Sequence, residues 1–463
     1  MVRKLNFTDL PALFACFVVL LSSKNSIAQL SVDHPAQGFK FLGTSACVQC
    51  HKDGHQSPSH AVAGYEYTIW ADQDPHACAY SSLFKEQSLA IARNLKLKTP
   101  PHKNDLCLNC HATNVSDRQL VPNSKHTVTD GVGCESCHGG AEQWVVAQTL
   151  PGWDQSSISE KSAMGFVNTD NIATRARKCV ECHVGSPSRD VNHDLIAAGH
   201  PRLYFEMAAY HAKMPRHWSR AKDLRKNGAT TEYKLWLVGQ YVSAAAALEQ
   251  IQRRANNASS PWPEFAEYNC FSCHHDLDKE RWKEQDVFAA KVATPEWGSW
   301  HFSILHSEND VVDKSQYREI ADQLTALKSE LSTFLPDRKQ VVPLTETMKF
   351  QLAEFAESLA NRSALPTSEI LSRPTAGDRS KLNWDSLAQR YLAAVALRQA
   401  RKDEQAYLGS DSPQKFVYSK MQLKEIREAL KFIDGHDGPR DSNENRDEQL
   451  RRQLDAISQD LLK

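Results

Sequence analysis

One short pattern constrains this chain more than any other feature: Cys-x-x-Cys-His, which its 463 residues contain five times. Two thiols separated by two residues can add to the two vinyl groups of one porphyrin, and the histidine that follows then reaches the iron. The pattern therefore predicts five covalently attached haem c groups. The predicted thioether ligands are Cys47, Cys50, Cys107, Cys110, Cys134, Cys137, Cys179, Cys182, Cys270 and Cys273, and the predicted proximal iron ligands are His51, His111, His138, His183 and His274.

Three other uses of paired cysteines fit the sequence less well. A zinc site closes with four ligands from two such pairs and needs no histidine after each pair. Thioredoxin-like proteins carry one redox pair in a domain, not five in series. A disulfide framework could use ten exported cysteines, but it gives no reason for the fixed histidine. The repeated histidine favours haem over all three.

Each predicted iron also needs a second axial ligand, unless it keeps an open position. The chain has nineteen histidines and only five are proximal, so enough remain to cap every iron. One of them, His76, follows Asp74-Pro75, which is typical of a helix start, and is expected in the first turn of a helix. The candidate distal ligands are His76, His200, His211 and His217, with His60 and His126 as weaker candidates and His301 and His306 also considered.

The N-terminus has the pattern of an export signal. Arg3 and Lys4 precede a twelve-residue apolar run at residues 10–21, and a small-x-small site ends at Ala28. We expect residues 1–28 to be a signal peptide cleaved after Ala28, with Cys16 inside the discarded part, and the mature protein to be periplasmic. An uncleaved membrane anchor is the alternative, although the apolar run is short for a membrane span.

Charge is nearly balanced, with 55 basic and 56 acidic residues. Such a balance gives no indication of a nucleic-acid partner. The expected partners are periplasmic or membrane-bound redox proteins.

The chain changes character after about residue 285. Residues 29–284 are expected to form a pentahaem cytochrome c domain, and residues 285–463 contain no cysteine and show amphipathic helical patterns. Strand signals are scarce throughout, so the expected fold class is mostly α, a multihaem domain followed by a bundle-like helical region. This region could also dock the protein to a larger complex.

Several segments have apolar residues at helical spacing. A long helix is expected at residues 232–255, before the fifth motif. The expected apolar faces of the C-terminal region are Ile320, Leu324, Leu327, Leu331 and Phe334; Met348, Leu352, Phe355 and Leu359; Trp384, Leu387, Tyr391 and Val395; and Leu423, Ile426, Leu430 and Ile433.

The sequence Gly-Val-Gly-Cys-Glu-Ser-Cys-His-Gly at residues 131–139 resembles the multihaem cytochrome c-554 family. The similarity covers roughly residues 41–275. It includes Asp-Pro-His-Ala-x-Ala-Tyr at residues 74–80, similar to the family's distal-ligand helix, and residues 205–218, similar to another ligand-bearing helix. The resemblance implies haems with two histidine ligands, stacked in parallel pairs, and a role in periplasmic electron transfer.

Two features depart from the family pattern. The family's type member has four haems, whereas this chain has five motifs and an added C-terminal region. Family members often place a histidine ten residues after the histidine of the Glu-Ser-Cys-His motif, and this chain has Gln148 there. One iron is therefore expected to lack its sixth ligand or to take it from His55, His60 or His126.

Two functions follow, and the leading one is a carrier that relays electrons between redox partners. The alternative is an oxidoreductase with one open haem that acts on hydroxylamine, nitrite or nitric oxide. No motif ends in the lysine that multihaem nitrite reductases use, and full axial ligation suits electron transfer. The sequence favours the carrier over the enzyme.

Overall fold

The structure is a computed structural model, and it describes residues 38–52, 54, 64–228, 231–268, 273, 297–298, 300–303, 305, 314–362 and 384–408. These residues belong to one compact unit, Val32–Lys463. They form helices joined by turns, and the β pairing among them consists of isolated bridges. The mostly α fold class is thus confirmed. The predicted signal peptide lies outside the described residues, as do His55, His60, Cys270, His274 and His306.

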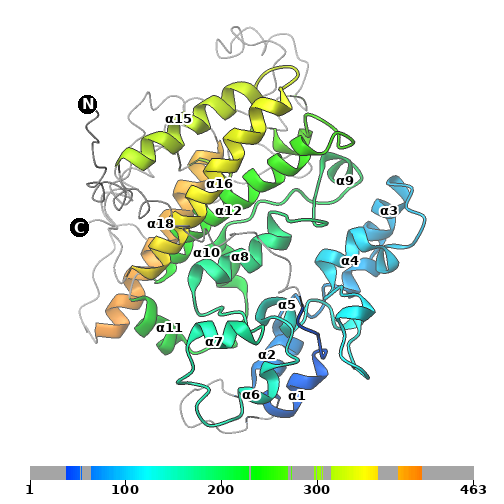
Figure 1. Cartoon of the computed structure of the whole chain (residues 1–463), viewed down its shortest axis with the longest axis vertical. Helices are drawn as coiled ribbons and strands as arrows, with labels where there is room; N and C mark the ends of the chain where they lie inside the picture. Colours follow the sequence, from blue (N-terminus) through cyan, green and yellow to red (C-terminus); the bar gives the residue numbers. More distant parts are fainter. Residues whose placement is uncertain are drawn as a thin grey trace, which may run out of the picture. The chain divides into compact units, whose positions relative to one another are not determined.

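The chain up to residue 227 is built from short helices (Figure 1). They are α1 (Ser45–His51), α2 (Glu66–Gln73), η1 (Ser81–Phe84), α3 (Glu86–Asn94), η2 (Pro101–Lys103), α4 (Asp105–His111), η3 (Asp117–Gln119), η4 (Val128–Asp130), α5 (Cys134–His138), α6 (Trp144–Ala147), α7 (Ile158–Ala163), α8 (Ile172–His183), α9 (His193–Ala197), α10 (Met207–Lys213) and α11 (Arg220–Asn227). Each of the first four motifs forms the last residues of a helix, namely α1, α4, α5 and α8. One helical turn spans the two cysteines, and the proximal histidine ends the helix.

The predicted helical start at Asp74-Pro75 is wrong. Residues 75–80 form successive turns that lead into η1. Most of their backbone hydrogen bonds run from an N–H to the carbonyl three residues earlier. The N–H of Ala77, for example, donates to the carbonyl of Asp74 at 3.0 Å. His76 therefore lies on a tight turn, where the carboxylate of Asp74 accepts from its backbone N–H at 3.0 Å and contacts its ring Nδ1 at 2.8 Å.

The centre of the hydrophobic core is α12 (Thr231–Asn256), which confirms the predicted long helix. Most of its residues are buried, among them Leu235, Trp236 and Leu248, each at most 1% exposed. It packs against α8, which carries the fourth motif, and against α16 (Arg338–Asn361) and α18 (Trp384–Leu408). Figure 1 shows α16 and α18 running beside α12.

The C-terminal helices confirm most of the predicted apolar faces and correct two of them. On α15 (Lys314–Leu331) and α16 the predicted residues are buried or half-buried. Phe334 is wrong, because it follows the end of α15 and is 83% exposed. On α18 the buried face consists mainly of alanines and Leu397, while the predicted Val395 is 37% exposed. The fourth predicted face, residues 423–433, lies outside the described residues.

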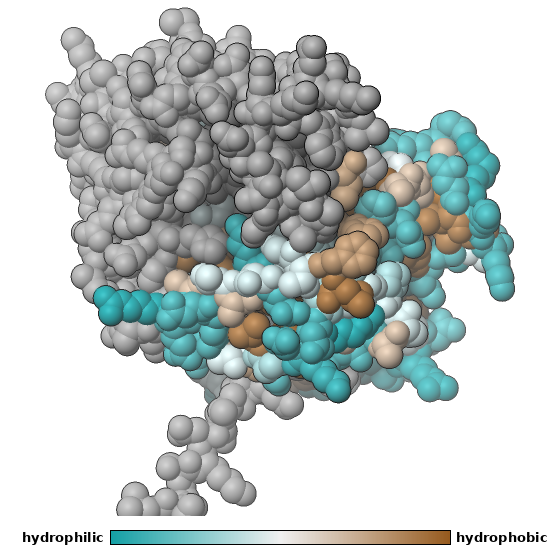
Figure 2. All heavy atoms as spheres, turned by 90° about the horizontal axis from the view of Figure 1, so that it is seen from above, coloured by the Kyte–Doolittle hydropathy of each residue, from teal (hydrophilic) through white to brown (hydrophobic). Residues whose placement is uncertain are grey.

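The core crosses the predicted domain boundary at residue 285. One cluster of buried side chains joins α8 and α12 to α15, α16 and α18. Among the described residues visible in Figure 2, hydrophilic side chains predominate and apolar side chains form small groups between them. In the part of the chain that the structure describes, no helix is both long and apolar enough to cross a membrane.

Candidate haem sites

Glu135, inside the third motif, joins that motif to the segment that precedes the first. The residue is 3% exposed. It accepts hydrogen bonds from the backbone N–H groups of Leu42 at 3.0 Å, Gly43 at 2.8 Å and Ala141 at 2.8 Å. Three hydrogen bonds to one buried side chain fix the third motif relative to the segment that leads into the first.

Replacing Glu135 with alanine should destabilise the protein by about 3–5 kcal/mol, because three buried N–H groups lose their acceptor. Urea unfolding measures the loss. Glu142→Ala is the matched control, since that side chain is exposed, and it should change the free energy of unfolding by less than about 0.5 kcal/mol. Equal stability of the two variants would contradict the structural role of Glu135.

Arg189 links the second and fourth motifs in a comparable way. Its guanidinium donates to the carboxylate of Glu181, in the fourth motif, at 2.9 Å and to the carbonyl of Asn109, in the second motif, at 2.7 Å. The same carboxylate also accepts from Lys178 at 2.7 Å. Both motifs are therefore attached to one half-buried cation.

The cysteines show the same pairing of motifs. The thiol of Cys47 is in hydrogen-bonding contact with that of Cys134, and the thiol of Cys110 with that of Cys182. The first motif thus lies against the third, and the second against the fourth. The pairs expected from the family resemblance require such an arrangement. No disulfide bond joins any of the ten cysteines that the structure describes.

Two pairs of histidine rings have the separation expected of axial ligands. Two imidazoles bonded to opposite sides of one iron at about 2.0 Å have ring centroids about 6.2 Å apart. The centroids of His76 and His183 are 6.1 Å apart, and those of His138 and His217 are 6.4 Å apart. These separations make His76 and His217 the described candidates for distal partners of the fourth and third motifs.

A second feature of these histidines is how their Nδ1 atoms are engaged. Nδ1 of His76 contacts the carboxylate of Asp74 at 2.8 Å, and Nδ1 of His51 contacts Glu66 at 2.8 Å. Nδ1 of His217 lies 3.4 Å from the carbonyl of Pro215. Such contacts orient the ring and leave Nε2 for the metal, as in many metal sites.

The charge state of the rings also suits metal binding. Burial, together with the facing His217 and His76, lowers the pKa of His138 and of His183 to about 4. Both proximal rings are therefore neutral at pH 7, which is the form that binds a metal. The hydrogen bond that the carboxylate of Asp74 accepts from His76 raises the pKa of His76 against the effect of burial, which makes this ring a more basic ligand.

His200 lies near the proximal histidine of the second motif. Its Nδ1 lies 2.8 Å from the carbonyl of Pro201. Burial lowers the pKa of His200, and the nearby His111 lowers it further. Nδ1 of His111 contacts Ser82 at 3.0 Å and the carbonyl of Ala79 at 3.1 Å. In both rings Nδ1 makes these contacts, so Nε2 is the nitrogen left for a metal.

His211 has the opposite arrangement and is not brought near a proximal histidine. Its Nε2 lies 2.9 Å from Nη1 of Arg175, and its Nδ1 is buried without a partner in the described structure. Burial and the arginine lower the pKa of His211 to about 3. The ring packs on Trp218 with centroids 4.9 Å apart. Of the two histidines predicted in this segment, the geometry favours His217.

The first motif has no such partner among the described residues. No ring contact joins His51 to another histidine there, and Gln148 lies at the half-exposed end of α6. His126 lies against Gly43, close to the start of α1, and its Nε2 is buried without a partner in the described structure. His60 lies outside the described residues, so its predicted role stays a prediction.

A cavity adjoins the pair formed by His138 and His217. His217, Glu66, Asp170 and Lys222 are among its lining residues, and it encloses about 600 Å³ of empty space when its open side is included. The ammonium group of Lys222 lies 3.1 Å from Asp170. Such cations near a porphyrin can pair with its propionates. In the described ranges no three metal-binding side chains converge on one point, and an axial site in haem requires only two.

Short helices that end in Cys-x-x-Cys-His, with pairs of histidine rings facing each other between them, are the features expected of a mostly α c-type cytochrome. Residues 46–139 match the model of the family described as cytochrome c554 and c-prime, which confirms the family resemblance. This stretch contains the first three motifs. The match implies covalently bound haem c and electron transfer. No curated protein and no solved structure matches the chain.

Several residues that build these sites were not identified from the sequence. Glu135 and Glu181 lie inside motifs whose haem chemistry does not require a carboxylate. The presence of a glutamate there could have indicated that the side chain has a structural role. Gly131 has a positive φ of 70°, and a Cβ there would lie 2.4 Å from the carbonyl oxygen of His76. The glycine therefore lets the third-motif loop approach the His76 turn, where the N–H of Val132 donates to the carbonyl of His76 at 2.9 Å.

Proposed function

We propose that the protein is a periplasmic multihaem c-type cytochrome that relays electrons between redox partners through five covalently bound haems. The observation that carries the proposal is the pair of histidine contacts at 6.1 and 6.4 Å, on two motifs that each lie against another motif. Iron with two histidine ligands has no open position, so it suits electron transfer better than substrate binding.

The chain's own residues would hold and tune these groups. When bound, haem supplies the one-electron chemistry of its iron. His138 and His217 would bind one iron from opposite sides, and His183 and His76 another. Asp74 orients the ring of His76, and Glu66 orients the ring of His51 in the first motif, each through Nδ1. Carboxylate partners of this kind are expected to tune the reduction potential.

We propose periplasmic or membrane-bound redox proteins as donors and acceptors. The C-terminal helices α15, α16 and α18 share the core of α12, so they would also form part of the support for the fourth motif. We also propose that these helices dock the protein to a larger complex. A pull-down of the full chain from membranes would test whether such a complex binds it.

The rival function is an oxidoreductase with an open haem at the first motif. The feature that favours it is His51, which has no histidine partner in the described ranges, together with Gln148 in the position where relatives carry a ligand. His126 is the described residue best placed to close that site, because its buried Nε2 has no other partner.

Electron paramagnetic resonance of the oxidised protein separates the two functions. The relay predicts that every haem is low-spin and that the reduced protein does not turn over nitrite, hydroxylamine or nitric oxide. A high-spin signal that shifts when nitrite or nitric oxide is added would contradict a pure relay. Intact mass measures the number of attached haems, and five are expected.

His217→Ala should convert the haem of the third motif from low to high spin, because His138 then has no opposite ligand. Electron paramagnetic resonance measures the change, which should appear as one high-spin haem among the expected five. His193→Ala serves as control, since His193 begins α9 and its ring contacts Phe265. A wholly low-spin spectrum of His217→Ala would remove this residue from the ligands.

A further inference from the structure

The second motif lies in a part of the molecule built from four short helical elements, η1, α3, η2 and α4, which we call the second-motif lobe (residues 81–111). These elements pack against one another, and Leu83 and Leu108 belong to the small buried cluster between them. At the surface, the ring of Phe84 on η1 stacks on His102 of η2 with centroids 4.4 Å apart. The lobe is therefore a packed structure that carries one predicted haem attachment site.

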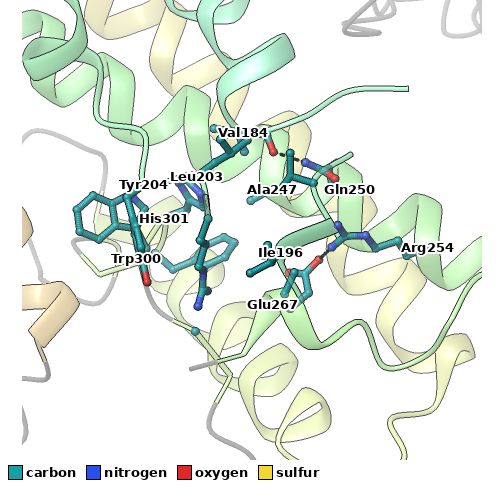
Figure 3. A pocket seen from close by; sticks show the side chains of 15 residues that line it. Val184, Ile196, Leu203, Tyr204, Ala247, Gln250, Arg254, Glu267, Trp300 and His301 are labelled. Carbon is teal, nitrogen blue, oxygen red and sulfur yellow. Dashed lines mark hydrogen bonds and ion pairs between the residues drawn. The ribbon is translucent and has the colours of Figure 1, made fainter. Parts of the chain in front are cut away.

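The lobe is attached to the rest of the fold through α9. Ile91 of α3 shares one buried cluster with Leu195 and Ala198. Nδ2 of Asn94 also donates to the carbonyl of Ala198 at 2.9 Å. Ile196 of α9 lines a cavity together with side chains of α12 (Figure 3). Because α9 contacts both the lobe and this cavity, it covers one side of the lobe and connects it to the core helix.

Positive charge is concentrated on the lobe. Residues 85–103 contain five cations and a single acidic residue, Glu86. The cations, all of them exposed, are Lys85, Arg93, Lys96, Lys98 and Lys103. Arg93 pairs with Glu86 at 2.6 Å, whereas the four lysines form no ion pair with any residue that the structure describes. The whole chain has a net charge of −1, so this excess of positive charge is local to the lobe.

Two large apolar side chains are exposed on the same lobe. Phe84 is 51% exposed and Leu106 is 41% exposed. Leu106 directly precedes Cys107 on α4, the helix to which the second motif would attach its porphyrin. Protein–protein interfaces combine apolar anchors with a polar rim. The lobe offers both, next to a predicted redox group.

We propose that the second-motif lobe is the surface on which an acidic redox protein docks, and that electrons pass between this partner and the haem of the second motif. The inference rests on the proposed function, because it requires haem on that motif. Complementary charge favours an acidic partner, since opposite charges steer the encounter of two proteins and raise its rate.

A protein fits this surface better than an anionic lipid bilayer does. The helix that carries Arg93, α3, has nine residues, and its apolar Ile91 and Ala92 are buried. Phe84 is held by its stacking on His102. The lobe therefore lacks the long helix with one apolar face that lies in a membrane interface.

The test measures how fast reduced plant-type ferredoxin, a small acidic iron–sulfur protein, reduces the oxidised full-length protein in stopped-flow experiments. One electron passes from the cluster to a ferric haem, and no bond is formed or broken. The double variant Lys96→Glu, Lys98→Glu should slow this reaction by about tenfold or more at low ionic strength, because it reverses part of the charge that steers the encounter. The difference should disappear at about 0.5 M salt, because screening then shortens the range of the attraction.

The matched control is Lys339→Glu, Lys402→Glu. Both residues are exposed, on α16 and α18, and the variant changes the net charge by the same amount. Its rate should stay within about twofold of that of the unaltered protein. Equal rates for the two double variants, or a rate of the unaltered protein that does not depend on salt, would overturn the inference.

Two further measurements separate the alternatives. Lys85→Glu, Lys103→Glu should slow the reaction as Lys96→Glu, Lys98→Glu does, which keeps the test decisive if one of the variants folds poorly. Vesicles of phosphatidylglycerol test the lipid alternative. If the charge reversals abolish binding to these vesicles and leave the ferredoxin rate unchanged, the lobe binds lipid and the proposal fails.

Optical spectra distinguish failure of this inference from failure of the proposed function. Haem absorption of the double variants should equal that of the unaltered protein, because the substituted residues are exposed. If dithionite reduces the haems of every variant and the ferredoxin rates do not differ, the docking surface is wrong and the relay stands. If the unaltered protein carries no haem, the proposed function itself fails.

Discussion

Replacing His76 with alanine should turn one haem, the one attached at the fourth motif, from low spin to high spin. The imidazole of His76 faces that of His183 with ring centroids 6.1 Å apart, and no other described histidine ring is in contact with His183. Without His76 the iron would keep a single strong ligand, which favours the high-spin state. Electron paramagnetic resonance and optical spectra of the oxidised protein measure the change, which should involve one haem of the five.

The matched control is His211→Ala, which removes another histidine that the sequence alone marks as a ligand candidate. Its Nε2 contacts Arg175, so the spectrum should stay low-spin even if stability falls. The haem can be identified with Cys179→Ser, Cys182→Ser, in which His76→Ala should add no further high-spin signal. A low-spin spectrum of His76→Ala, or a high-spin spectrum of His211→Ala, would contradict the pairing.

Truncation after residue 313 should abolish the folded protein, although residues 314–463 contain no cysteine. It removes α15, α16 and α18, whose buried residues include Leu324, Leu352 and Leu397, each fully buried. Burying one such side chain contributes about 1.5–3 kcal/mol, and a whole domain is stable by only about 5–15 kcal/mol. Soluble yield and haem content per chain measure the effect, and both should fall by at least tenfold.

Polar contacts strengthen this expectation. On α12, Nζ of Lys234 donates to the carbonyl of Arg362 at 2.7 Å, and Gln240 donates to Gln389 at 2.9 Å. Truncation would remove the hydrogen-bond partners of Lys234 and Gln240 and expose the apolar face of α12 that surrounds them. The fourth-motif helix is affected too, because Arg177 of α8 forms an ion pair with Glu357 of α16.

The control is truncation after residue 408, which removes no described residue. It should keep the haem content of the full chain. If truncation after residue 313 also leaves haem content and spectra intact, the C-terminal helices form a separate module, as the sequence boundary at residue 285 predicts, and the shared core is not essential.

The sequence was informative where the chemistry is local. The spacing inside each motif follows from the distance between two vinyl groups and one iron, so it can be recognised without a fold. The same holds for α12, whose buried length is visible as a run of apolar and small residues at 232–255. The start of the His76 segment was misjudged because Asp74-Pro75 opens turns as readily as helices, and tertiary contacts with Gly131 and Val132 decide between them.

The distal ligands show the limit of such reasoning. His211 and His217 have similar surroundings in the sequence, but an arginine from α8 engages one and a proximal histidine faces the other. The partner of a distal histidine lies far away along the chain, so no local pattern can identify it.

The sequence by itself determined the helical character of the chain and predicted the attachment sites of the haems and their proximal ligands, because each depends on residues a few positions apart. Only the tertiary structure decided which motifs lie together, which histidines face them and that the C-terminal helices share the core of α12. These depend on contacts between residues tens to hundreds of positions apart, such as those of Glu135 with Leu42 and of Arg177 with Glu357. Packing and the burial of charge select such contacts, and composition and spacing do not encode them locally.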